Sequence, residues 1–149
     1  AAEYPATRDL KAAIRFVRAN AAQYGVDPTR VALAGGSAGA ISSIAAGVVD
    51  EDDYKTELLG EDPTLTSTHL NMSSGVQCVV SHWGAGYGEM AVQYADPANR
   101  SRYTAGAAPI IEFHGDADTT VPFADAVAVE AAYKQLNSSE RCSSKQKSR

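Results

Sequence analysis

Gly35-Gly36-Ser37-Ala38-Gly39 is a G-x-S-x-G sequence between a β-like run, residues 31–34, and a helix-like run, residues 40–49. A serine on a sharp strand-to-helix turn has an exposed hydroxyl and a strained backbone, which proteins keep mainly where it serves function. Small residues are needed there because the strand and the helix nearly touch. Gly35, Gly36, Ala38 and Gly39 supply that smallness, and glycine tolerates unusual backbone angles. The stretch therefore predicts a strand, a turn that presents Ser37, and a helix.

Helices and strands alternate on both sides of this turn. Spacing and turn residues predict helices over 7–24, 38–49 and 123–136, and strands over 31–34, 76–81 and 109–113. This order indicates an α/β fold, a three-layer α/β/α sandwich around a parallel sheet. Because ligands in such sheets bind at the carboxyl ends of the strands, Ser37, His82 and loop 114–122 should share one edge.

The first predicted helix has Thr7 as its N-cap and Gly25 as the residue after its end. Leu10, Ile14, Val17 and Ala21 form its apolar stripe, and the cations lie away from that stripe: Arg8, Lys11, Arg15 and Arg18. The acidic segment 50–72 is expected to be a solvated loop. Residues 137–149 contain no aliphatic or aromatic residue and are predicted to be a disordered or aberrant tail after a domain spanning 1–136.

Composition excludes several classes of partner. The chain has 149 residues, 44% of them hydrophobic, which suffices for one domain with a core. A net charge of −5 without a basic patch argues against a nucleic-acid partner. No apolar run approaches the ~20 residues of a transmembrane segment. Nothing in the sequence indicates an oligomeric state.

The cellular location has only weak sequence signals. Two cysteines, Cys78 and Cys142, do not make a disulfide framework. Asn71, Asn99 and Asn137 each begin an N-x-S sequon, which suggests secretion, although chance in a serine-rich chain explains them equally well. The chain opens with Ala1, with neither an initiator methionine nor a signal peptide, so the location is left open.

A serine nucleophile needs a base, an acid that orients the base, and an oxyanion hole. The amide of Ala38, directly after Ser37, is one candidate oxyanion donor. The acid is expected in the loop His114–Pro122, which follows a predicted strand. Asp118 is the better candidate there, because Asp116 is placed to close the turn locally.

Two stretches resemble α/β-hydrolases of the carboxylesterase/lipase type, most of all small feruloyl and carbohydrate-acyl esterases. They are DLKAAIRFVRANAAQYGVDPTRVALAGGSAGA at 9–40 and APIIEFHGDADTTVPF at 108–123, about a third of the chain. The resemblance implies Ser37 as nucleophile, Asp118 as triad acid, and hydrolysis of a small-molecule ester through an acyl-enzyme with no cofactor or metal. It implies a structural role for His114.

The chain departs from this family in its catalytic machinery. The HGGG-type oxyanion loop and the early strands precede the elbow in the family, and the catalytic histidine follows the acid. All three histidines here, His69, His82 and His114, precede Asp118, and only His82 lies at a suitable strand end. We therefore expect an incomplete α/β-hydrolase fold, a fragment that is inactive and marginally stable alone.

Three other interpretations compete with this one. His114, Asp116 and Asp118 could be ligands of a metal, but no second cluster completes the shell. Residues 84–88 (GAGYG) fail the dinucleotide fingerprint because Glu89 occupies the position of its last glycine. A non-catalytic binding or adhesion protein on a hydrolase scaffold is the main alternative.

The aromatic residues of loop 82–108 fit either an acyl pocket or a core: Trp83, Tyr87, Tyr94 and Tyr103.

Overall fold

Helices and strands alternate along the chain as the sequence predicts. The computed structural model describes residues 3–89 and 96–146, so Tyr94 lies outside the described residues. Its elements are α1 (Glu3–Ala19), α2 (Ala21–Tyr24), β1 (Ala32–Gly36), α3 (Ala38–Val48), the 3-10 helix η1 (Pro63–Ser67), β2 (Cys78–His82), the 3-10 helix η2 (Gly86–Glu89), β3 (Ile110–Phe113) and α5 (Phe123–Gln146). Each predicted strand is present with its ends shifted by at most two residues, the first predicted helix is divided into α1 and α2, and the last one continues ten residues beyond its predicted end.

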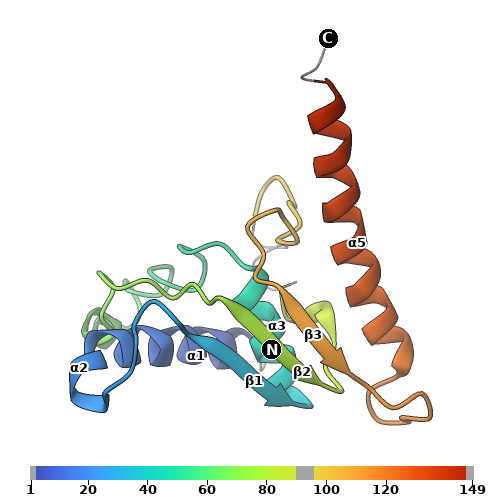
Figure 1. Cartoon of the computed structure of the whole chain (residues 1–149). Coiled ribbons are helices and arrows are strands. Elements are labelled where there is room, and N and C mark those ends of the chain that lie inside the picture. The colour runs from blue at the N-terminus through green and yellow to red at the C-terminus, as the bar shows by residue number, and fades with distance from the viewer. Residues whose placement is uncertain (1–2, 90–95, 147–149) are drawn as a thin grey trace.

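The three strands form one parallel sheet in the order β1-β2-β3. In its register Gly36 lies beside His82, and His82 lies beside Phe113, so the carboxyl ends of all three strands meet at one edge (Figure 1). This confirms the parallel α/β architecture. Ser37, His82 and the loop after Phe113 follow or end these strands, as expected from the topology.

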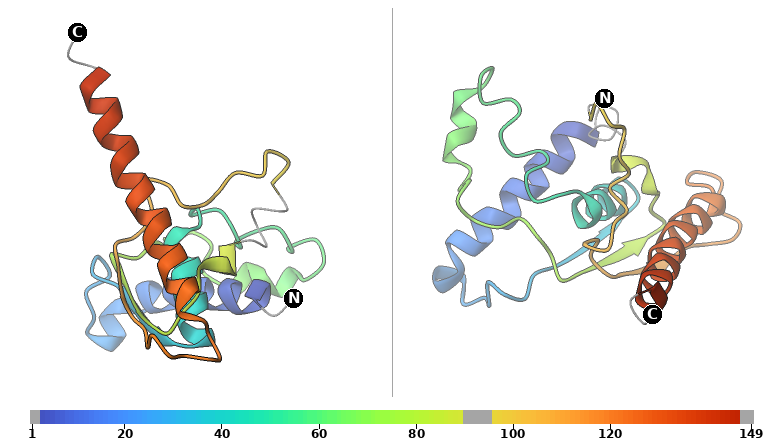
Figure 2. Two further views of the ribbon diagram at one scale, coloured as in Figure 1. Left: turned by 90° about the vertical axis from the view of Figure 1, so that its right-hand side faces the viewer. Right: turned by 90° about the horizontal axis from the view of Figure 1, so that it is seen from above.

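Helices α1 and α3 cover one face of the sheet (Figures 1 and 2). Leu33 of β1 packs against Ile14 of α1 and Ala46 of α3. Val79 of β2 packs in a second cluster with Ile44 of α3 and Val129 of α5. The core therefore lies between the inner face of the sheet and the two helices.

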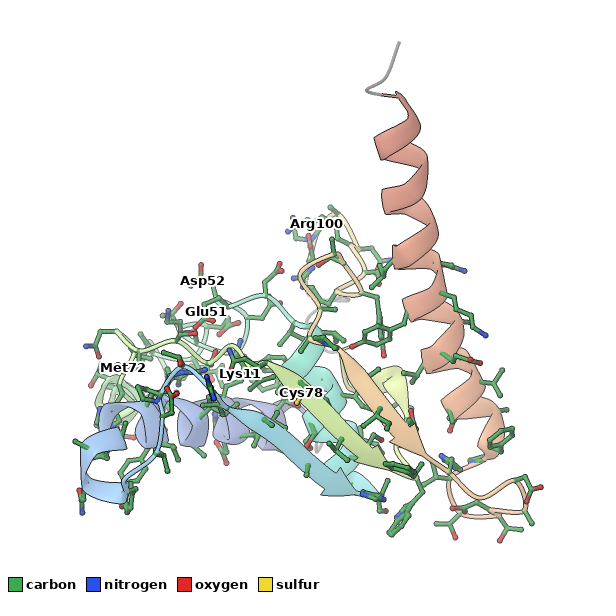
Figure 3. The ribbon with its side chains drawn as sticks, viewed as in Figure 1. Lys11, Glu51, Asp52, Met72, Cys78 and Arg100 are labelled. Carbon is green, nitrogen blue, oxygen red and sulfur yellow. The ribbon has the colours of Figure 1, made fainter. Side chains whose placement is uncertain are left out.

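The opposite face of the sheet is open within the described part of the chain. Because strand side chains alternate, Ile111 and Phe113 of β3 point to that face, where they are 52% and 50% exposed. Ala32 and Ala34 of β1 are exposed on the same face, and Cys78 of β2 is half-buried there (Figure 3). The described residues thus build two of the three layers of the predicted sandwich.

Helix α1 differs from its predicted form in its start and in its polar face. It begins at Glu3, so Thr7 lies inside the helix and is buried, and its predicted role as N-cap is wrong. The predicted end is confirmed, because Gly25 adopts the left-handed conformation with φ 64° after α2. Lys11 and Arg15, expected on a solvated face, are each 1% exposed. Segment 50–75 folds over them, and its carbonyl oxygens accept their hydrogen bonds.

The acidic segment 50–72 is ordered by these contacts rather than freely solvated. Glu51 accepts hydrogen bonds from Ser73 and Ser74, and Asp53 forms an ion pair with Arg102. Asp52 is solvated, as predicted for this segment, since its side chain is 93% exposed. Figure 3 shows the segment with Glu51 and Asp52 above α1, on the side that carries Lys11.

Helix α5 extends to Gln146 and so includes most of the region predicted to be disordered. No proline or glycine interrupts residues 123–146, and several good helix formers lie beyond Leu136, which lets the helix continue once it has begun. Figure 1 shows this end of α5 rising away from the sheet. The lack of secondary structure expected after Leu136 is therefore wrong for residues 137–146.

Candidate active site

Ser37 occupies a strained turn between β1 and α3. Its φ is 54° and its ψ is −124°, an unusual conformation for a residue with a side chain. Three backbone hydrogen bonds hold it there: its N–H donates to the His82 carbonyl at 3.0 Å, and its own carbonyl accepts from the amides of Ala40 at 2.9 Å and Ile41 at 3.0 Å. The side chain is exposed, and its hydroxyl has no hydrogen-bond partner among the described residues. This is the conformation predicted for a presented serine.

The glycines around Ser37 are not equally constrained. A Cβ on Gly35 would lie 2.4 Å from the carbonyl carbon and oxygen of Gly39, so strand and helix meet at that point. A Cβ on Gly36 would lie 3.0 Å from the Trp83 ring. A Cβ on Gly39 would meet nothing within 4 Å, so the smallness predicted for Gly39 is not required by the described residues.

Ala38 is the first residue of α3. Its N–H therefore belongs to the first turn, whose amides have no acceptor within the helix. The partial positive charge of a helix N-terminus adds to these free donors.

The candidate acid, Asp118, lies in the loop between β3 and α5. One carboxylate oxygen, Oδ1, accepts hydrogen bonds from the amides of Thr120 at 2.8 Å and Val121 at 3.0 Å. These amides, first that of Thr120, lower the pKa of Asp118, and His114 adds a smaller effect in the same direction. Asp118 is therefore a carboxylate at neutral pH, held by one oxygen, while Oδ2 lies 3.9 Å from His114 Nε2.

The acid loop is fixed to the helix that begins after Ser37. Val121 is 7% exposed and packs against Ile41 of α3 and Ala85 of the segment after β2. Ile41 is four residues after Ser37, so this apolar contact links the acid loop to the elbow. No hydrogen bond or ion pair joins Asp118 to Ser37 within residues 3–89 and 96–146; a base would have to lie between them.

No histidine side chain in the described part of the chain hydrogen-bonds to Ser37. The ring of His82 stacks on Phe113 with centroids 5.1 Å apart, on the open face of the sheet. The ring of His69 lies against Phe16. His114 is buried, and its Nε2 lies 2.8 Å from the Val121 carbonyl oxygen. His82 contributes its carbonyl to the Ser37 turn, a role that the sequence does not reveal.

Two features near the site are absent from the sequence prediction: the buried carboxylate of Glu112 and the backbone conformation of Trp83. Glu112 of β3 points inward, where its Oε1 accepts hydrogen bonds from Ser81 Oγ and the Gly84 amide, both at 3.1 Å. Trp83 has a φ of 44° and covers Gly36. A carboxylate in the apolar run IIEF was the available signal for Glu112; no signal indicates the conformation of Trp83.

The alternative sites gain no structural support. A Cβ on Gly84 would lie 2.4 Å from Ser81 Oγ and 2.9 Å from Ala40 Cβ, so this glycine is needed for packing against α3. No group of three or more potential metal ligands is assembled in the part of the chain that the structure describes. No described helix has both the length and the apolar character of a membrane span.

Comparison with known proteins agrees with this geometry. The family model named BD-FAE matches residues 1–94, which include the elbow. The chain belongs to the BD-FAE family. The BD-FAE assignment supports the α/β-hydrolase, carboxylesterase-like character inferred from the two motifs.

Individual relatives of this BD-FAE member are esterases. The chain is 29% identical to esterase LipQ of Mycobacterium tuberculosis, and the match covers 85% of the chain. A truncated carbohydrate esterase from gut microbiota matches 87% of it at 26% identity with a TM-score of 0.65. The butyrate-bound Est2 esterase of Thermogutta terrifontis matches 88% at 28% identity and TM-score 0.64, and the same esterase phosphoramylated by tabun matches at 31% identity and TM-score 0.62.

The chain spans only part of these proteins. It covers 33% of LipQ, 55% of the truncated carbohydrate esterase and 50% of the butyrate-bound Est2 chain. The comparisons therefore describe an incomplete α/β-hydrolase fold, in agreement with the sheet that is covered on one face.

Proposed function

We propose that this chain carries the nucleophile and the acid of a serine carboxylic-ester hydrolase. Ser37 attacks the ester carbonyl while a base takes its hydroxyl proton; the C–O bond of the ester breaks, the alcohol leaves with that proton, and water then hydrolyses the acyl-serine. Ala38 N–H is one donor to the developing oxyanion, and Asp118 orients the base. The observation that carries this proposal is the turn at Ser37: a serine with φ 54°, fully presented, directly before a helix N-terminus.

The electrostatics of Asp118 support its role. A triad acid must be ionised at the pH of catalysis and must keep an oxygen for the base. Two amides hold Oδ1 and lower the pKa of Asp118, while no amide of the described residues donates to Oδ2. Asp116 is exposed in the same loop and serves as a natural comparison.

Residues 1–149 alone are proposed to be inactive towards esters. The rings of His69 and His82 are engaged with Phe16 and Phe113, and His114 is buried against Val121. Without a base, a serine hydrolase loses about six orders of magnitude in turnover. Residues 1–136 then form the partial hydrolase domain, and 137–149 lie outside it.

The proposal is tested by labelling with a fluorophosphonate, followed by peptide mass spectrometry. The probe suits this question because a similar esterase is phosphoramylated by tabun. The protein to be labelled is the longest natural polypeptide that contains these residues, and residues 1–149 are labelled in parallel. We expect an adduct on Ser37 in the longer polypeptide, none in Ser37→Ala, and at least a thousandfold slower labelling of the short chain.

Asp118→Asn and Asp116→Asn form the matched pair for the acid. The change at Asp118 should lower kcat for a short-chain aryl ester by about 10⁴, the scale known for triad acids. The change at Asp116 should leave kcat within about twofold. An equal effect of both variants, or an adduct on another serine, contradicts the assignment. No adduct at all would favour a binding or adhesion protein on this scaffold.

A further inference from the structure

Glu112 and His114 face each other in a buried space beneath the acid loop. Their side chains are 13% and 2% exposed, and Glu112 Oε1 lies 3.7 Å from His114 Nδ1. Among residues 3–89 and 96–146, neither His114 Nδ1 nor Glu112 Oε2 has a hydrogen-bond partner, although both atoms are buried. Buried polar atoms without partners are uncommon and call for a specific explanation.

The other ring nitrogen of His114 fixes where one proton lies. Nε2 is 2.8 Å from the Val121 carbonyl oxygen, which can only accept, so Nε2 must carry a proton. If Nδ1 then had no proton, its lone pair would face the carboxylate oxygens of Glu112 in a buried space. A second proton, on Nδ1, turns this unfavourable contact into a charge-assisted one.

The protonated ring also faces Asp118. Nε2 lies 3.9 Å from Asp118 Oδ2, and the same Nε2 holds the carbonyl of Val121, whose amide binds Asp118 Oδ1. One imidazole thus contacts both the backbone that carries the acid and the free oxygen of the acid. The aromatic ring of Phe123 at the start of α5 packs against the imidazole edge to face.

We propose that Glu112 keeps His114 doubly protonated and that the resulting imidazolium positions Asp118 for catalysis. Glu112 and His114 are positioning residues: neither touches the reacting atoms. The proposal rests on the role of Asp118 given above. It replaces the purely structural role of His114 that the family resemblance implies, and it assigns a role to the buried carboxylate of β3.

The first test uses the unmodified 149-residue chain and reads the imidazole nitrogens of His114 by NMR. We expect both nitrogens to carry protons at pH 7. A single protonated nitrogen, Nε2, would overturn the proposal. This measurement needs no variant and therefore does not depend on whether a substitution folds.

The second test follows the titration of Asp118 through the amide shifts of Thr120 and Val121, which bind its Oδ1. His114→Gln keeps a donor that reaches the Val121 carbonyl but removes the positive charge. We expect the Asp118 midpoint to rise by about half a pH unit or more, because an opposite charge at this distance favours the carboxylate. An unchanged midpoint would reduce His114 to a structural hydrogen-bond donor.

Glu112→Gln shows whether Glu112 affects the titration of Asp118 through His114 or directly, because the two routes shift the Asp118 midpoint in opposite directions. Acting directly, loss of a negative charge near Asp118 would lower the Asp118 midpoint. Acting through His114, it removes the imidazolium and raises the midpoint. We expect a rise, and no further rise when Glu112→Gln is added to His114→Gln. Glu130→Gln, an exposed change on α5, should leave the midpoint unchanged.

These readouts are independent of ester hydrolysis. If Ser37 failed to label but both nitrogens of His114 were protonated and the Asp118 midpoint moved as stated, the proposed function would fail and this arrangement would stand. If Ser37 were labelled but the Asp118 midpoint did not move, the proposed function would stand and the positioning role of His114 would fail.

Discussion

At the scale of single residues, the turn at Ser37 depends on one very close approach of strand and helix. Gly35 and Gly39 are not interchangeable in this respect, although the G-x-S-x-G pattern treats them alike. Only at Gly35 does the backbone of the neighbouring element occupy the space of a Cβ. The free energy of unfolding should therefore respond to one glycine and not to the other.

Gly35→Ala is expected to lower the free energy of unfolding by about 1–3 kcal/mol, the cost of overpacking a tight contact. Gly39→Ala lies in α3 without a steric conflict and should be neutral or stabilising by up to about 1 kcal/mol, since alanine favours helix. Urea unfolding of both variants measures the difference. Equal destabilisation by the two changes would contradict the close approach.

The residues of the site differ in how far they could be predicted. Ser37 and Asp118 are recognisable because each lies at a fixed place in a local motif. Glu112 and the contact between Val121 and Ile41 join segments that are far apart in the chain, and no local pattern encodes them. The partners of each histidine ring, and hence its availability as a base, likewise depend on tertiary packing.

At the scale of elements, α1 is held to segment 50–54 by a buried ammonium group. Lys11 Nζ donates to the carbonyl oxygens of Asp50, Glu51 and Asp53 at 2.7, 3.2 and 2.5 Å. Helical periodicity places Lys11 away from the apolar stripe, and from this a cation would be expected to face water. The segment that covers it has no periodic pattern, so its path could not be predicted.

Burial lowers the pKa of Lys11 to about 8, while Asp53 and Glu51 act in the opposite direction. Between about pH 8 and the ordinary lysine pKa near 10.4, the unfolded chain binds more protons than the folded chain, so stability rises with pH. We expect the free energy of unfolding to increase by about 2 kcal/mol from pH 7.5 to 9.5.

Lys11→Met should abolish this rise, and Lys134→Met, at an exposed position of α5, should preserve it. Urea unfolding across the pH range gives both results. A rise of the same size in Lys11→Met would assign the pH dependence to other groups.

At the scale of the whole molecule, the sheet is covered on one face and open on the other. Ile111 and Phe113 are half-exposed there, and the outer edge of β3 borders a groove of about 690 Å³ against α5. Parallel sheets are normally covered on both faces. The layer architecture followed from the order of elements, whereas the extent of the open face became visible only when the register was known.

Residues 1–149 are therefore expected to self-associate at micromolar concentration, because exposed apolar faces and strand edges promote association. Ile111→Lys should raise the concentration at which association begins by about tenfold, and Val26→Lys, remote from the sheet, should not. Sedimentation velocity over a concentration series measures this. Association that is insensitive to Ile111→Lys would point to another surface.

The position of Trp83 gives the chain a built-in optical probe. It is the only tryptophan in the sequence, it is 46% exposed, and its ring covers Gly36, the residue before Ser37. A group attached to the serine hydroxyl would change the surroundings of this indole. Covalent modification could then be followed in real time by intrinsic fluorescence, with no dye, no tag and no chromogenic substrate.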